Sequence, residues 1–458
     1  MFPFFPPILR SFVTCDTGKF TRRGLYIQPE IHAYLPSCLC NQDTRSLQTA
    51  FMSNLQAMPD EQRRRPRRVP RQDVKEDELS DIHRIETFRI ACNDQHSSPL
   101  FNILPVEIRD LIFMYALSDH EDLTRPYDVE TCYRRPGYMG PRKTETALLR
   151  TCQAIYRDAW YWPWTQAQHT FFLTAGERKP MKTTQTSQME HTLRLIEKLH
   201  PDVPARRKEV SNIQIFAQLY LLEPGQCLSQ ILQIPHFRPR TVTITLRHTD
   251  IWFWEEDSPI HINSPWVSYC RFPASVTTLR LQIESIERRK PQVDYVANKI
   301  RREWHFTRTD DTHLVCGGEG PLEELRWTGS STWGHKRWIR DEDDREPGIL
   351  RYYVATIPFK PANFITDATG YEARRQKGIP PRVQVPPDVA ARTQVPGGGG
   401  RHASLQVVQA MQAGVTSDTP ASEALKLVQE WSQARINARR RMIAMRNWQA
   451  LMNHDQAT

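Results

Sequence analysis

The residues best suited to chemistry stand in one short stretch, RHTDIWFWEED, at positions 247–257. His248 and Asp250 could orient an imidazole for general-base catalysis, or join the following acids in binding a metal ion. The stretch follows a segment that alternates as a strand does, and loops at strand ends commonly form the sites of α/β domains. Residues i and i+2 of a strand share a face without necessarily touching, and no second carboxylate–histidine pair can be placed nearby.

Three interpretations of this stretch stay open. The tryptophans could pack the end of a sheet while the acids remain solvated, or the loop could bind a protein or ligand. The third is a hydrolase or metal-dependent enzyme centred on His248 and Asp250. As a working hypothesis we take a client-binding loop, and its residues would be Arg247, His248, Asp250, Trp252 and Trp254.

The remaining motifs do not indicate an enzyme. The GGEG segment at 317–320 lacks the Lys-Ser/Thr of a phosphate loop and the glycine spacing of a dinucleotide site. Cys38 and Cys40 have no second pair at zinc-finger spacing, and Cys152 falls on an apolar helix face typical of a structural thiol. We therefore predict a non-enzymatic protein with no catalytic, cofactor-binding or metal residues.

Two apolar helical patterns precede this stretch and are predicted to position it. Leu104–Leu117 begins with Pro105 at a first helical position and carries apolar residues at helical spacing, and Ala147–Trp160 repeats the pattern before Pro163. We expect two antiparallel helices. Their contact residues would be Ile108, Leu111, Ile112, Leu148, Cys152 and Ile155.

The wording of these two segments, LPVEIRDLIFMYAL and TALLRTCQAIYRDAW, resembles the F-box-like hypothetical proteins that are abundant in filamentous fungi. YRRPGYMGP at 133–141 and RHTDIWFWE at 247–255 also resemble that family, and the resemblance covers roughly residues 100–305. It implies a substrate receptor of a ubiquitin ligase that binds a Skp1-type adaptor and an unknown client protein. Its adaptor-facing residues would be Leu104, Pro105, Ile108 and Leu111. The insert at 118–143 departs from a standard F-box, whose helices follow one another closely.

Strand patterns dominate the chain from about residue 205. Val242, Ile244 and Leu246 alternate with threonines, and Leu279, Leu281 and Ile283 repeat the alternation, so these residues should face one core. Strands separated by helical segments predict an α/β domain over 205–360 with one sheet. The predicted fold class is α+β, with an F-box-like helical unit over 97–175 preceding that domain.

The two ends of the chain differ from this middle. The chain has 458 residues, a net charge of +9, 34 prolines and nine cysteines, and its arginines cluster at 63–71. Residues 1–96 are predicted to be mostly disordered. The scattered, odd number of cysteines favours reduced thiols in the cytoplasm or nucleus. No apolar run is long enough for a transmembrane segment, and arginines without interleaved aromatics make nucleic acid an unlikely partner.

The C-terminal part is predicted to be a Pro/Gly-rich linker over 361–418, followed by a basic amphipathic helix over 419–453. Its apolar stripe would run from Leu427 through Trp431 to Met452, with arginines beside it. Such a helix could dock on its own domain, enter a partner's groove or lie on an anionic membrane.

Overall fold

The computed structural model describes residues 88, 91–93, 95–317, 320–364, 380–395 and 402–455, the last range with side chains to residue 449. All of them lie in one unit, residues 77–458. The predicted disorder of 1–96 falls outside the described residues except at its last few positions. The arginine cluster at 63–71 and the glycine run Gly397–Gly400 within the predicted linker also lie outside them.

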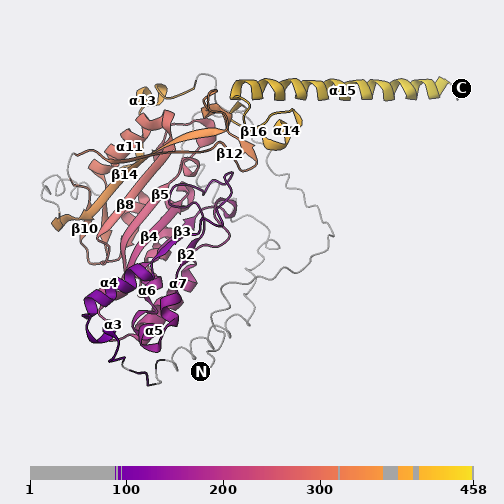
Figure 1. Ribbon diagram of the computed structural model, residues 1–458. Helices are drawn as coiled ribbons and strands as arrows, with labels where there is room; N and C mark the ends of the chain where they lie inside the picture. Colours follow the sequence, from indigo (N-terminus) through magenta and orange to yellow (C-terminus); the bar gives the residue numbers. More distant parts are fainter. Residues whose placement is uncertain are drawn as a thin grey trace, which may run out of the picture. The chain divides into compact units, whose positions relative to one another are not determined.

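A nine-stranded sheet occupies the centre of the described part of the chain, which has an α+β fold (Figure 1). Its strand order is β3-β4-β5-β8-β14-β10-β9-β7, with β11 paired to β14. The first four strands are parallel, which requires crossover connections, whereas β14 runs antiparallel to β8. The strands are β3 (Gln168–Leu173), β4 (Val210–Ala217), β5 (Pro239–Leu246), β7 (Arg271–Phe272), β8 (Thr278–Ile286), β9 (His305–Arg308), β10 (His313–Val315), β11 (Glu323–Ser330) and β14 (Ile349–Pro361).

The core face of β5 and β8 is the predicted one. The two strands pair in parallel, with Val242 opposite Leu279 and Ile244 opposite Leu281. All six alternating apolar residues are fully buried. The other face carries a hydrogen-bonded chain of polar side chains: Gln214 Nε2 donates to Thr245 Oγ1 (2.8 Å), which donates to Gln282 Oε1 (2.7 Å). Because Thr245 is itself buried, this end of the sheet is covered on both faces.

Helices fill the crossovers and cover the core face. α11 packs on β8 and β14 (Figure 1) through four fully buried residues at helical spacing, Val293, Val296, Ala297 and Ile300. The same spacing of Met189, Leu193 and Ile196 forms α7, which our sequence analysis missed. The helices are α7 (Thr186–Leu199), α8 (Leu219–Leu222), α9 (Gln226–Leu232), α10 (Pro265–Tyr269) and α11 (Lys290–Glu303).

The predicted pair of antiparallel helices is wrong in two respects. Ala147–Trp160 is not one helix, because the backbone at Cys152 is extended (φ −158°, ψ 163°) between the 3-10 turn η3 and α5, so Cys152 lies outside any helix face. α4 buries Phe113 and Leu117, while Leu111 is 47% exposed. These elements are α3 (Pro99–Asn102), α4 (Val106–Ala116), η3 (Ala147–Arg150), α5 (Gln153–Ala159) and α6 (Trp162–Gln166).

The predicted boundaries at 175 and 205 do not separate two folding units. β3 lies inside the predicted helical unit, and it pairs in parallel with β4 along its whole length. The helices before β3 therefore belong to the same body as the sheet, and α4 contacts α6, which leads directly into β3.

The predicted linker over 361–418 is wrong where the structure describes it. Val383, Ala390 and Leu405 are buried, because short strands of this segment pair with the body: β15 with β6, and β16 with β13. A further small sheet pairs β1 with β2 around the 118–143 insert. These elements are β1 (Asp119–Glu121), β2 (Arg142–Thr144), β6 (His261–Ile262), β12 (Thr332–Trp333), β13 (Lys336–Arg337), β15 (Val383–Gln384), α13 (Pro387–Ala391), β16 (Leu405–Gln406) and α14 (Val407–Gln412).

The predicted C-terminal helix is present as one long element, α15 (Ala421–Asp455) (Figure 1). The prediction that it is amphipathic is wrong, because Ile436 and Ile443 lie opposite the stripe that contains Met445. The start of α15 is attached to the body, where Ala421 and Ala424 pack against Ile339 and Leu405. Among the helices of the described residues, none is long and apolar enough to cross a bilayer.

Candidate functional site

The predicted client-binding loop is mostly buried. It begins where β5 ends, with a 3-10 turn η6 (His248–Asp250). Arg247, His248 and Asp250 are each at most 3% exposed, and Trp254 is also buried. Only Trp252 of the five residues is partly exposed. This corrects the prediction that the loop presents these side chains to a client.

Arg247 and Asp250 form a buried bidentate ion pair. The Arg247 guanidinium donates from Nε to Asp250 Oδ2 (2.6 Å) and from Nη2 to Oδ1 (3.0 Å), and the Arg247 backbone N–H donates to Oδ2 (3.2 Å). Arg178 Nη1 lies 3.6 Å from the same carboxylate. Both Asp250 oxygens are therefore engaged by arginines, which removes Asp250 as the orienting partner of a catalytic His248.

A second buried ion pair ties the 118–143 insert to the sheet. Arg135 Nη1 lies 3.0 Å from Oε2 of Glu284 on β8, and the indole of Trp327 donates to the same oxygen (3.1 Å). Burial raises the pKa of Glu284, and the nearby Arg135 charge opposes that shift. The guanidinium groups of Arg135 and Arg247 both lie over the Phe216 ring, at 5.5 and 5.3 Å from its centroid. The insert is thus a packed part of the body.

His248 is a buried, neutral imidazole. Its Nδ1 lies 3.0 Å from the hydroxyl of Ser285, which is itself fully buried. Burial lowers the pKa of His248 well below its ordinary value, and the positive charges of Arg289, Arg340, Arg288 and Arg178 lower it further. A serine bonded to an imidazole can be activated as a nucleophile, but a substrate must reach it.

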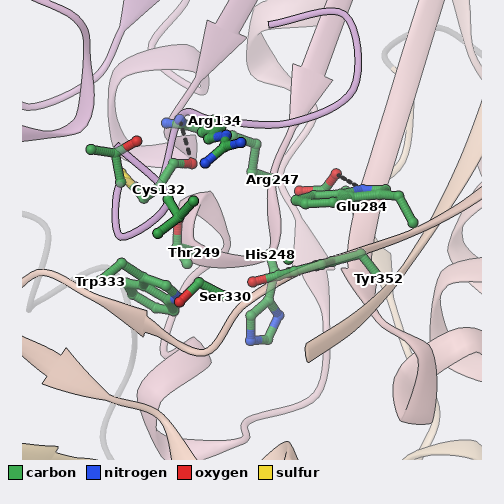
Figure 2. A pocket seen from close by; sticks show the side chains of 13 residues that line it. Cys132, Arg134, Arg247, His248, Thr249, Glu284, Ser330, Trp333 and Tyr352 are labelled. Carbon is green, nitrogen blue, oxygen red and sulfur yellow. Dashed lines mark hydrogen bonds between the residues drawn. The ribbon is translucent and has the colours of Figure 1, made fainter. Parts of the chain in front are cut away.

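The cavity at this point has the size of a few water molecules. It measures about 30 Å³, and a water needs roughly 10–15 Å³ on this measure. Figure 2 shows the imidazole of His248 directed away from the side chains of Cys132 and Arg247. The residues that line the cavity include Cys132, Arg247, His248, Thr249, Glu284, Ser330, Trp333 and Tyr352. Polar groups do converge beside His248, but a cavity of this volume does not accommodate an organic substrate.

Metal binding finds no support in the part of the chain that the structure describes, where no three histidine, cysteine or acidic side chains are placed to hold an ion.

Trp254 of the loop belongs to a buried aromatic cluster. The Trp254 ring lies 5.0 Å from that of Trp333 and 4.4 Å from that of Trp338. The buried Ala403 completes the cluster, so this part of the loop packs against the C-terminal segment.

Three aromatic side chains near this cluster reach the surface, and the sequence alone did not distinguish them from the buried ones. Phe253 is 54% exposed and Tyr220 is 45% exposed, with Trp252 between them at ring distances of 6.1 and 6.5 Å. Phe253 has a left-handed backbone (φ 51°), an uncommon conformation for a bulky residue. We call Tyr220, Trp252 and Phe253 the aromatic triplet.

The predicted adaptor-facing residues lie mostly at the surface. Pro105, Ile108 and Leu111 are exposed and Leu104 is half-buried. One side of α4 is apolar and open to solvent, and we call it the α4 face: its residues are Ile108 (43% exposed), Leu111 (47%), Ile112 (37%) and Tyr115 (74%). At about 100° per residue these four lie within roughly one third of the helix circumference.

The opposite side of α4 is fixed to the body. Phe113 and Leu117 are buried there, Asp110 forms an ion pair with Arg207, and Arg109 lies over the Phe101 ring at 5.1 Å. The sequence pattern predicted that the side with Ile108, Leu111 and Ile112 faces the core, whereas the structure buries the side with Phe113 and exposes the predicted one.

Comparison of this chain with protein-family models, curated proteins and solved structures gave no match.

Proposed function

We propose that this chain is a non-enzymatic protein-interaction protein that binds a Skp1-type adaptor of a ubiquitin ligase through the α4 face. The observation that carries the proposal is an apolar helix side open to solvent on a helix anchored by its other side. Exposed apolar patches on soluble domains commonly mark interaction surfaces. Here Ile108, Leu111 and Ile112 supply aliphatic contact area and Tyr115 supplies a large aromatic side chain.

The resemblance to F-box-like proteins supplies the kind of partner. Three of its four adaptor-facing residues, Pro105, Ile108 and Leu111, are exposed. The long insert is compatible with adaptor binding, since Arg135 attaches it to Glu284 on the sheet and leaves the α4 face uncovered.

A substrate receptor also needs a surface for its client. We assign this to the aromatic triplet rather than to the buried ion pairs, because Phe253 and Tyr220 are exposed. Aromatic residues are enriched among the anchors of protein interfaces. We place this activity in the cytoplasm or nucleus, where the free cysteines of the described chain, such as Cys132 and Cys227, would stay reduced.

Co-purification with a Skp1-type adaptor tests the proposal. Ile108→Asp puts a charge into the centre of the α4 face and should abolish co-purification, because an unpaired charge would be buried in the interface. Val408→Asp is the matched control, since Val408 is an exposed valine on α14 (64% exposed). It should co-purify as the wild type does.

Both variants replace exposed side chains, so their thermal unfolding should remain close to that of the wild type. Equal co-purification of both variants, or none with the wild-type chain under conditions that retain the adaptor on a known F-box protein, would refute the proposal.

A further inference from the structure

Beyond its first three turns, α15 leaves its side chains uncovered. Every side chain from Gln433 to Gln449 is exposed, including Met442 (57%), Met445 (64%) and Trp448 (62%). At about 1.5 Å per residue this segment is roughly 25 Å long. The sequence left three docking modes open for this helix. Docking on its own domain is confined to the start of the helix. We call residues 433–449 the exposed segment of α15.

The start of α15 is firmly attached. Asp344 accepts hydrogen bonds from the backbone N–H (3.1 Å) and the hydroxyl (2.9 Å) of Ser422. The buried Arg337 donates to the Thr419 carbonyl (2.6 Å) and is paired with Glu342 (2.6 Å). The exposed segment therefore continues from a fixed helix start.

The exposed segment is strongly basic. It contains five arginines and no acid, which gives it a charge of +5. A surface of one sign favours partners of the opposite sign and disfavours like-charged ones. A second copy of this helix would bring another five arginines, in either a parallel or an antiparallel pair. The charges therefore disfavour a helix dimer and favour an acidic partner.

Apolar side chains stand on two sides of the exposed segment. Successive residues turn by about 100°, so Met442, Met445 and Trp448 lie together, and Ile436 and Ile443 lie roughly 160° away. Ile436 is 47% and Ile443 is 49% exposed. Helices that lie on a membrane have one apolar side and a polar opposite side. A planar membrane surface could cover only one of the two apolar sides here, whereas a channel could enclose both.

We propose that the exposed segment of α15 binds an acidic protein whose methionine-rich or otherwise apolar channel encloses the helix. Met442, Met445 and Trp448 fill one wall of the channel, and the two isoleucines contact the other. Four of the five arginines lie between these two sides and pair with carboxylates at the rim, and Arg441 lies on the side of the methionines, next to Trp448. This second docking surface does not depend on the adaptor proposed for the α4 face.

Binding of the full chain to calcium–calmodulin, an acidic protein with such a channel, tests the proposal. The wild-type chain should bind with calcium and release when calcium is chelated, because chelation closes the apolar groove. The triple variant Met442→Gln, Met445→Gln, Trp448→Gln should raise Kd at least about tenfold, as loss of interface anchors does. The charge-reversal variant Arg439→Glu, Arg440→Glu, Arg441→Glu should do the same.

A second charge-reversal variant, Arg150→Glu, Arg206→Glu, Arg345→Glu, is the matched control. It changes the net charge by the same amount at three exposed arginines outside α15 and should leave Kd within about twofold. Equal weakening by both charge-reversal variants would show non-specific attraction and overturn the proposal. So would absence of calmodulin binding, binding to phosphatidylserine vesicles in its place, or self-association in sedimentation that the α15 variants abolish.

Discussion

At the residue scale, the end of the sheet is built on buried charges. Arg135 pairs with Glu284, and Arg247 pairs with Asp250, with Phe216 beneath both guanidinium groups. Such pairs contribute little net stability when complete, but removal of one partner leaves an uncompensated charge in a poorly solvated place. They hold the 118–143 insert and the loop after β5 in fixed positions.

Arg135→Met should lower the free energy of unfolding by about 3–5 kcal/mol, because Glu284 would lose its counter-charge while remaining buried. Chemical denaturation measures the loss. The double variant Arg135→Met, Glu284→Gln should recover part of it, since the uncompensated charge is then gone. A loss below about 1 kcal/mol in the single variant would show that the pair is not buried as described.

His248 should make stability depend on pH. In the unfolded chain its pKa is the ordinary 6.5, whereas burial keeps the folded imidazole neutral. Above pH 6.5 His248 therefore adds no pH dependence to the free energy of unfolding. Below pH 6.5 the His248 imidazole binds a proton in the unfolded state but not in the folded state. The free energy of unfolding should fall by about 1.4 kcal/mol per pH unit from this residue.

The pH dependence of denaturation in His248→Gln should lack this contribution below pH 6.5. The matched control is His402→Gln, which replaces an exposed histidine. An unchanged slope in His248→Gln would mean that the imidazole is accessible to protons in the folded state.

At the element scale, an apolar pattern predicts the buried face correctly in β8 but not in α4. Leu281 alternates with polar residues in a strand and is fully buried, whereas Leu111 lies on a helix with two apolar sides and is 47% exposed. Which side of α4 faces the core is set by the packing of Phe113 and Leu117, which are buried against the body.

The same substitution at Leu281 and at Leu111 should change the free energy of unfolding by different amounts. Leu281→Ala should cost about 2–5 kcal/mol, as expected for a fully buried leucine, and Leu111→Ala less than about 1 kcal/mol. Urea denaturation of both variants gives the comparison. Similar losses at the two positions would mean that the α4 face is covered in solution.

Local sequence patterns predicted those parts of the fold that depend on residues close together in the chain. The alternation of Ile244 and Leu281 predicts their burial, and the spacing of Val296 and Ile300 predicts α11. The contact of Arg135 with Glu284 joins residues far apart in the chain, and Glu284 occupies a strand position where a polar residue is expected to face solvent. The burial of Val383, Ala390 and Leu405 likewise depends on distant partners, so proline and glycine content alone indicated a linker.

At the scale of the whole molecule, the described part of the chain carries the α4 face and the exposed segment of α15, two uncovered surfaces of different character, besides the aromatic triplet. The α4 face is aliphatic and precedes the sheet in the chain, and the exposed segment of α15 is basic and follows it. Between them, the polar residues predicted to form a loop site stabilise the sheet end instead. This arrangement is the basis of our proposal that the chain binds other proteins.

Hydrogen–deuterium exchange of the full chain, with and without a Skp1-type adaptor, tests the central proposal most directly. Binding through the α4 face predicts slower exchange of the amides in residues 104–116 on adding the adaptor, with α15 unchanged. The Ile108→Asp variant should show no such slowing. Unchanged exchange over 104–116 at saturating adaptor, or slowing confined to other segments, would contradict the account.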